Sequence, residues 1–147
     1  LGGVCDGVLR CRSTCTYDFS GCDCGGEFAG SCYRLSARIA PSWAGARDGC
    51  VSLGGHLMTI TSAAEFVAVN SNPALNPGGP SGWLWIGGRR IGGSWTWDND
   101  EPWSYTAWDE GQPTGTPGDD YLVAHGAEGR WTSHADSGDF AFLCEWP

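Results

Sequence analysis

The hydrophobic pattern predicts a first helix between Ser42 and Leu53. Apolar side chains recur there at near-helical spacing and include Trp43 and Cys50. Gly54-Gly55 follows directly, and glycine is favoured where a helix ends because it adopts left-handed backbone conformations without strain. We therefore expect one helix that stops before this glycine pair.

A second helix is predicted to begin after Ser62. Serine is a favoured N-cap residue, and Glu65 follows three positions later, as in a capping box. The apolar residues Phe66, Val67 and Val69 come next. Asn72-Pro73 ends this pattern, and the glycines and prolines of residues 76–82 predict a loop, because proline interrupts helices and strands.

The second half of the chain has the pattern of strands. The apolar run Trp83 to Gly87 is typical of a buried strand, and Ser94 to Trp97 follows it across a turn at Gly92-Gly93. Tyr121 to Ala124 and Phe140 to Trp146 are the remaining predicted strands. Helices that precede most of the strands, rather than alternate with them, indicate an α+β fold.

The segment from Asp98 to Asp120 has no hydrophobic period. A loop of this length in a compact domain is usually functional or disordered. Trp103, Tyr105 and Trp108 lie within it, and disordered segments are poor in aromatic residues. We therefore expect an ordered loop that carries function.

The cysteine content indicates a disulfide-stabilised protein. The chain has 8 cysteines and 24 glycines in 147 residues, which is typical of secreted domains from an oxidising compartment. Most of the cysteines lie near the amino terminus: Cys5, Cys11, Cys15, Cys22, Cys24 and Cys32. Their spacing leaves the pairing open, and a zinc site is disfavoured because no pair has Cys-x-x-Cys spacing. We expect a cysteine-rich segment over residues 1–23 and one domain over residues 24–147.

The charge of the chain excludes some partners. A formal net charge of -9 disfavours nucleic acid and anionic membranes, because both attract lysine and arginine. No apolar run has the length of a membrane span, so membrane insertion is not expected. The chain begins with Leu1 rather than methionine, which indicates a processed or trimmed chain.

The sequence contains no recognisable catalytic motif. It has no Gly-x-Ser-x-Gly or His-Glu-x-x-His motif, and its paired glycines do not have the spacing of a phosphate-binding loop. His56, His125 and His134 are scattered along the chain, as surface or packing histidines are. We therefore expect a binding protein and not an enzyme.

Short motifs in a fixed order identify a family resemblance. They are Trp83-Leu84-Trp85-Ile86-Gly87-Gly88, Trp95-Thr96-Trp97, Gln112-Pro113-Thr114, Trp131-Thr132-Ser133 and Phe142-Leu143-Cys144-Glu145. With Cys32-Tyr33-Arg34-Leu35 and Gly55-His56-Leu57 before them, this order resembles the C-type lectin-like domain over residues 24–147. The resemblance implies two helices packed on antiparallel sheets, with a long irregular binding loop and stabilising disulfides.

The resemblance also implies particular disulfides. It pairs Cys50 with Cys144, and Cys32 with either Cys22 or Cys24, as in long-form members of the family. The family's second usual disulfide braces the far end of the long loop. It would need cysteines near Tyr121 and Asp136, and this chain has none there. The loop is therefore expected to be held in another way.

In sugar-binding members of the family, oxygen ligands from the long loop hold Ca²⁺, and the sugar binds to the ion and to the same side chains. The matching residues here are Gln112, Thr114, Asp119, Asp120, Thr132 and Ser133. Gln112 favours the galactose-type arrangement. The set is poor in carboxylates, however, and Ca²⁺ affinity rises with the number of charged ligands. Calcium binding is therefore an open expectation.

Other side chains offer alternatives. Asp136 or Asp139 would add a carboxylate if the loop brought one inward, whereas the run Asp98-Asn99-Asp100-Glu101 is expected to be a solvated turn. Glu65 and Glu145 resemble positions that hold a structural calcium in some relatives, although the capping box already explains Glu65. Trp103 is a candidate for stacking on a sugar ring, whereas Trp108 and Trp131 are expected in the core.

Two functions follow from the resemblance. The first is a secreted lectin domain that binds a carbohydrate or glycoprotein through Gln112, Thr114, Asp119, Thr132, Ser133 and Trp103, with Ca²⁺ as its cofactor. The alternative is a calcium-independent protein-interaction or adhesion module of the same fold. A binder of ice or mineral surfaces shares the fold but has no specific support in the sequence. The sequence does not predict an oligomeric state.

Overall fold

The structure is a computed structural model that describes residues 10–11, 17–18, 24–75, 82–125 and 128–147. Cys5, Cys15 and Cys22 lie outside these ranges, as does nearly all of the loop expected over residues 76–82. Strands β1 (Arg10–Cys11) and β2 (Tyr17–Asp18) form a two-stranded antiparallel sheet. The boundary predicted between residues 23 and 24 stays a prediction.

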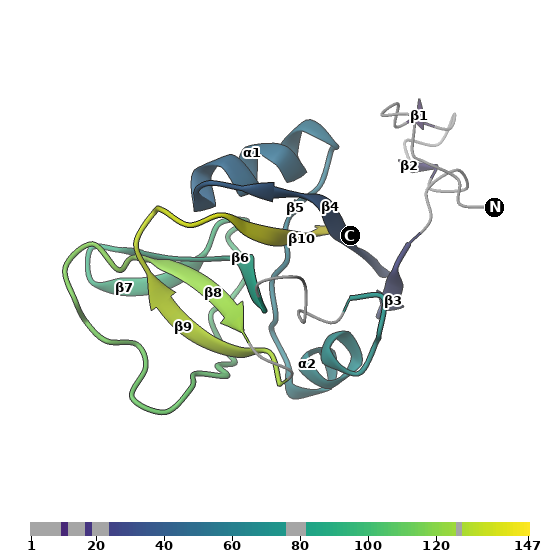
Figure 1. Cartoon of the computed structure of the whole chain (residues 1–147). Helices are drawn as coiled ribbons and strands as arrows, with labels where there is room; N and C mark the ends of the chain where they lie inside the picture. The colour runs from purple at the N-terminus through teal and green to yellow at the C-terminus, as the bar shows by residue number, and fades with distance from the viewer. Residues whose placement is uncertain (1–9, 12–16, 19–23, 76–81, 126–127) are drawn as a thin grey trace.

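The domain has the predicted α+β composition, with two helices that precede most of the strands (Figure 1). Its elements are β3 (Gly26–Phe28), β4 (Ser31–Ala40), α1 (Trp43–Ser52), β5 (His56–Leu57), α2 (Ala63–Asn70), β6 (Trp83–Ile91), β7 (Ser94–Trp97), β8 (Tyr121–His125), β9 (Arg130–His134) and β10 (Phe140–Trp146). Both helices and the four predicted strands are confirmed.

The larger sheet contains strands from both the beginning and the end of the domain's sequence. Its strand order is β3-β4-β10-β6-β8-β9, with β5 paired to β10 and β7 paired to β6. Strands β10 and β6 run parallel and the other pairs run antiparallel. The strand that ends the chain therefore lies in the middle of the sheet, and β9 lies at one edge.

Helix α1 begins and packs as the sequence predicts. Ser42 is its N-cap and accepts a hydrogen bond from the Gly45 N–H at 3.1 Å. Trp43, Ala46 and Cys50 face inward and are buried. Figure 1 shows the helix lying over β4 and β10, and the Cys50–Cys144 disulfide joins it to β10.

Helix α2 is capped differently from the prediction. Ser62 is the N-cap and accepts from the Glu65 N–H at 3.1 Å, as expected. The Glu65 carboxylate, however, does not complete the capping box at Ser62. It accepts from the Thr61 N–H at 2.7 Å and from the Tyr33 hydroxyl at 2.5 Å, so Glu65 ties α2 to β4.

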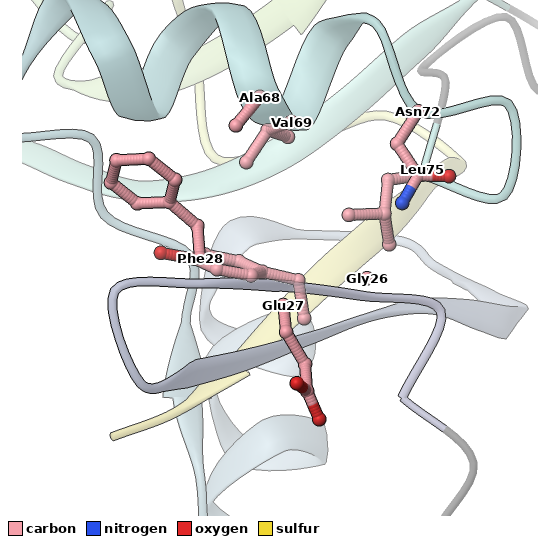
Figure 2. A pocket seen from close by; sticks show the side chains of 8 residues that line it. Gly26, Glu27, Phe28, Ala68, Val69, Asn72 and Leu75 are labelled. Atoms are coloured by element: carbon pink, nitrogen blue, oxygen red, sulfur yellow. The ribbon is translucent and has the colours of Figure 1, made fainter.

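Strand β3 packs closely against α2 and leaves a small hollow of about 10 Å³ between them (Figure 2). Phe28, Ala68 and Val69 line this hollow, whereas the Glu27 carboxylate points away from it. A Cβ atom at Gly26 would lie 2.3 Å from Asn72 Nδ2, so a larger residue here would force the Asn72 side chain to move. The Cys24–Cys32 disulfide holds the same hairpin, which selects Cys24 from the two expected partners of Cys32.

Candidate functional site

The long loop joins β7 to β8, and the structure describes it throughout. Figure 1 shows it extending beyond the ends of β7, β8 and β9. In its first part exposed residues alternate with more buried ones: Ser104 and Thr106 are exposed, whereas Trp103, Tyr105 and Ala107 are not. Alternation of this kind is typical of an extended segment with one face on the core.

The inward face of the loop completes a cluster of tryptophans. Trp97 and Trp131 are each only 1% exposed. Trp103 lies 4.6 Å from the Trp97 ring and 5.7 Å from the Trp131 ring, measured between ring centroids, and Trp95 and Trp108 lie alongside. The structure therefore gives Trp103 a packing role in a set of aromatic rings that anchors the loop.

The loop also pairs with the edge strand β9. The Trp131 N–H donates to the Ala107 carbonyl, and the Asp109 N–H donates to the Trp131 carbonyl, both at 2.9 Å. Two residues further along β9, the Ser133 N–H donates to the Gln112 side-chain oxygen at 3.1 Å. The loop thus lies along β9 as an additional strand would, and the Gln112 amide continues the pairing.

Four of the predicted site residues meet at this seam. Gln112 Oε1 also accepts from the Ser133 hydroxyl at 3.1 Å, and the Thr114 N–H donates to Ser133 Oγ at 3.1 Å. The Thr114 hydroxyl donates to Asp119 Oδ2 at 3.2 Å. Gln112, Thr114, Asp119 and Ser133 therefore form one hydrogen-bonded set, which we call the loop network.

The other predicted ligands lie apart from the loop network. Thr132 is buried, and its hydroxyl donates to the Ser133 carbonyl. It lies apart from the Ser133 side chain because neighbouring residues of a strand face opposite sides of the sheet. Asp120 pairs with Arg90 at 2.6 Å. Asp136 does not turn toward the loop, because its Oδ1 accepts from the Ala44 N–H at the start of α1. Asp139 is exposed.

The loop network does not fit a calcium ion. Its oxygens already hydrogen-bond to one another, and Asp119 is the only carboxylate among them. Ca²⁺ requires about six to eight oxygen ligands, and several of them are usually charged. Within the described ranges, no group of three or more histidine, cysteine or acidic side chains is arranged to hold a metal ion. The donor set therefore disfavours Ca²⁺ at this place.

The run from Asp98 to Glu101 is less solvated than the sequence predicts. Asp98 forms an ion pair with Arg89 at 2.9 Å, and Glu101 hydrogen-bonds to the Thr59 hydroxyl. Thr59 also donates its backbone N–H to Glu145 Oε2 at 3.0 Å. This turn therefore fixes the start of the long loop to β10 through Thr59.

Glu145 makes stability depend on pH. It is 2% exposed, and burial raises the pKa of this carboxyl above its usual range. The folded protein therefore holds a proton that the unfolded chain releases. This contribution to the unfolding free energy is fully present below the ordinary carboxyl pKa, and it is lost as pH rises through the raised pKa.

We expect Glu145→Gln to lose this part of the pH dependence, because glutamine does not titrate. The measurement is the urea unfolding free energy of both proteins in chelator, from about pH 4 to pH 8. The advantage of the native protein over the variant should shrink as pH rises. An advantage that stays constant across this range would contradict the prediction.

The fold and the loop define a small disulfide-stabilised α+β domain with one long loop along the edge of its sheet. The family model described as "Lectin C-type domain" matches residues 39–146. The chain therefore belongs to the C-type lectin domain family. Within the described ranges, neither helix is long and apolar enough to cross a membrane.

Known relatives differ in what their names describe. Over 125 residues, the chain is 28% identical to human (Homo sapiens) lymphocyte antigen 75, covering 82% of this chain and 7% of that protein. It is 36% identical over 87 residues to the type-2 ice-structuring protein of Hemitripterus americanus, covering 58% of this chain and 46% of that protein. The chain thus spans less than half the length of these two relatives.

A solved structure has a closely similar fold. The crystal structure of a calcium-independent type II antifreeze protein superposes with a TM-score of 0.71 at 25% identity, covering 85% of this chain and 93% of that one. The relatives thus share the fold of this chain, whereas their names describe different functions.

Two ion pairs of the loop are not predicted by the sequence. Arg90 pairs with Asp120, and His125 Nε2 lies 3.0 Å from Asp109 Oδ2. Arg90 lies in β6 and His125 in β8, at positions where an apolar pattern alone predicts nothing about polar partners. No local pattern in the sequence indicates such pairs, because the partners are far apart in the chain.

Proposed function

We propose that this chain is an extracellular recognition domain that binds a protein or glycoprotein surface through its long loop, without calcium. The ligand-binding surface consists of the loop network and the exposed residues 115–118 beside it. The disulfides support an oxidising compartment. The role is binding and not catalysis, in keeping with the family.

One observation carries this proposal: side-chain oxygens of Gln112, Thr114, Asp119 and Ser133 already form hydrogen bonds with one another. Ser133 Oγ contacts Gln112 Oε1 at 3.1 Å and Thr114 Oγ1 at 3.2 Å. To bind an ion, these oxygens would have to give up their hydrogen bonds for a site with one carboxylate. The similar fold of a calcium-independent type II antifreeze protein supports the same interpretation.

Direct binding of a saccharide is a second candidate. Gln112, Thr114 and Asp119 present amide, hydroxyl and carboxylate groups within one network, and each of these groups can exchange a hydrogen bond with a sugar hydroxyl. A glycan array probed with and without chelator tests both candidates. Glycan binding that survives the chelator and is lost in Gln112→Ala and Asp119→Ala supports the second candidate. Glycan binding that the chelator abolishes contradicts calcium independence.

Restoring the family's charged ligands should create a calcium site. The triple variant Thr114→Asp, Thr132→Asn and Ser133→Asp gives the loop network new carboxylates. We expect Ca²⁺ at about ten times its dissociation constant to stabilise this variant by about 1.4 kcal/mol, and to leave the native protein unchanged. The measurement is the melting temperature with Ca²⁺ and with chelator.

The matched control carries Asn at all three positions, so that it changes the same side chains without adding charge. This control should not respond to Ca²⁺. A calcium-dependent rise in the native protein that disappears in Asp119→Ala would contradict the proposal, because it would show that the native donors already bind the ion.

A further inference from the structure

Arg90 lies near the end of β6 and reaches across to the far end of the long loop. Its Nε donates to Asp120 Oδ1 at 2.6 Å, and its Nη2 donates to the Thr116 carbonyl at 3.0 Å. The Arg90 backbone N–H also donates to the Asp120 carbonyl at 2.7 Å. One arginine therefore holds both ends of the turn over residues 116–120.

This turn carries part of the proposed binding surface. The Asp119 N–H donates to the Thr116 carbonyl at 3.1 Å, and the Asp119 carboxylate accepts from Thr114. On the opposite side, Ser133 binds Thr114 and Gln112. The exposed residues between Thr114 and Asp119 are therefore held between Arg90 on one side and β9 on the other.

The surroundings of the Arg90–Asp120 pair favour a strong contact. The Arg90 side chain is 17% exposed and the Asp120 side chain 39%. A guanidinium that donates from two nitrogens is fixed in direction as well as in charge. Partial burial also reduces screening by salt, although it does not remove it.

In relatives, a disulfide and a bound calcium ion usually hold this loop, and the residues of this chain favour neither. Tyr121 and Asp136 stand where the resemblance places the loop disulfide, and the loop network does not fit Ca²⁺. A loop that must present side chains in one arrangement still needs a restraint, because free loop residues would lose conformational entropy on binding. Arg90 supplies a restraint at the same end of the loop.

We propose that Arg90 is a positioning residue for the long-loop binding surface and holds the turn that a disulfide and a metal ion hold in relatives. The inference rests on the proposed function, because it takes the turn to carry ligand contacts. If Arg90 has this role, the order of the binding surface depends on ionic strength and does not depend on chelators.

Hydrogen exchange measured by mass spectrometry tests the clamp without any ligand. In Arg90→Gln we expect peptides covering residues 112–120 to exchange roughly tenfold faster, since at least one charge-assisted hydrogen bond is lost. Arg90→Lys should give an intermediate rate, because an ammonium group keeps the charge but lacks the planar fork. The matched control is Arg89→Gln, which breaks the neighbouring ion pair with Asp98 and should leave this exchange unchanged.

The dependence of hydrogen exchange on salt concentration tests the charge of the Arg90–Asp120 pair. A purely structural role of Arg90 would not produce this dependence. Exchange of residues 112–120 in the native protein should rise between about 0.05 and 1 M NaCl, and this rise should be absent in Arg90→Gln. Chelator should have no effect on either protein. Native-like exchange and salt response in a folded Arg90→Gln variant would overturn the clamp.

Binding to a galactose-terminated glycoprotein, measured on a biosensor surface, tests the positioning role separately. If the native protein binds this probe, Arg90→Gln should weaken binding about tenfold and Arg89→Gln should not. If faster exchange leaves that affinity unchanged, the positioning role is overturned although the clamp exists. If the native protein binds neither this probe nor any glycan or protein tested, the proposed function fails while the exchange result stands.

Discussion

Replacing Cys50 and Cys144 together by alanine is expected to lower the unfolding free energy by about 4.5 kcal/mol. The two cysteines are 94 residues apart, and a cross-link over a loop of this length removes a large part of the freedom of the unfolded chain. The bridge also ties α1 to the central strand β10, and both sulfurs are buried. Urea denaturation of the native and double-variant proteins measures the loss.

The second disulfide offers a control for this prediction. Cys24 and Cys32 are only 8 residues apart, so the same relation gives a loss of about 2.5 kcal/mol for their double replacement. The long bridge should therefore contribute more than the short one. Equal losses in the two double variants would show that the freedom of the unfolded chain does not determine the effect.

Trp131→Ala should cost about 3 to 5 kcal/mol, the usual loss for a large aromatic side chain removed from a core. Trp131 packs edge-on against Trp97 and Trp108 and lies beside Trp103. The same residue pairs its backbone with Ala107 and Asp109, so a cavity here would loosen the loop as well as the core. Urea denaturation gives the loss, and near-ultraviolet circular dichroism reports the altered tryptophan packing.

Trp108→Ala is the matched comparison, because Trp108 lies at the edge of the same cluster and is half-buried. We expect it to lose less than half as much stability as Trp131→Ala, since less buried area and a smaller cavity are involved. A larger loss for Trp108 than for Trp131 would show that loop packing, rather than the inner core, dominates the cluster.

Local patterns predicted much of the fold. Helix α1 (Trp43–Ser52) lies within the span that its apolar spacing predicts. Helix α2 begins directly after the predicted cap Ser62, because capping involves residues only three positions apart. Strand β9 was missed, since Trp131 is its only large apolar residue. Its neighbours Thr132 and Ser133 are buried at 6% exposure because β8 and the loop cover them, and no local pattern records that contact.

The site was predicted less completely, for a physical reason. Motif order placed Gln112, Thr114, Asp119 and Ser133 in one group, and the structure brings these four side chains together, whereas their role in binding stays a prediction. What each side chain binds depends on distant partners. Asp120 turns to an arginine 30 residues away, and Asp136 turns to the start of α1, 92 residues away. Contacts of this range are fixed by packing and cannot be found from spacing.

The pairing of the loop with β9 has a consequence for self-association. An edge strand with free backbone groups invites a strand of another molecule to add to the sheet. Ala107, Asp109 and Gln112 take up three backbone groups of β9 that would otherwise face solvent. The segment proposed to recognise a partner thereby also shields the sheet from aggregation. An engineered loop would need to keep the two backbone hydrogen bonds to Trp131 and the side-chain acceptor at position 112 to leave this edge of the sheet covered.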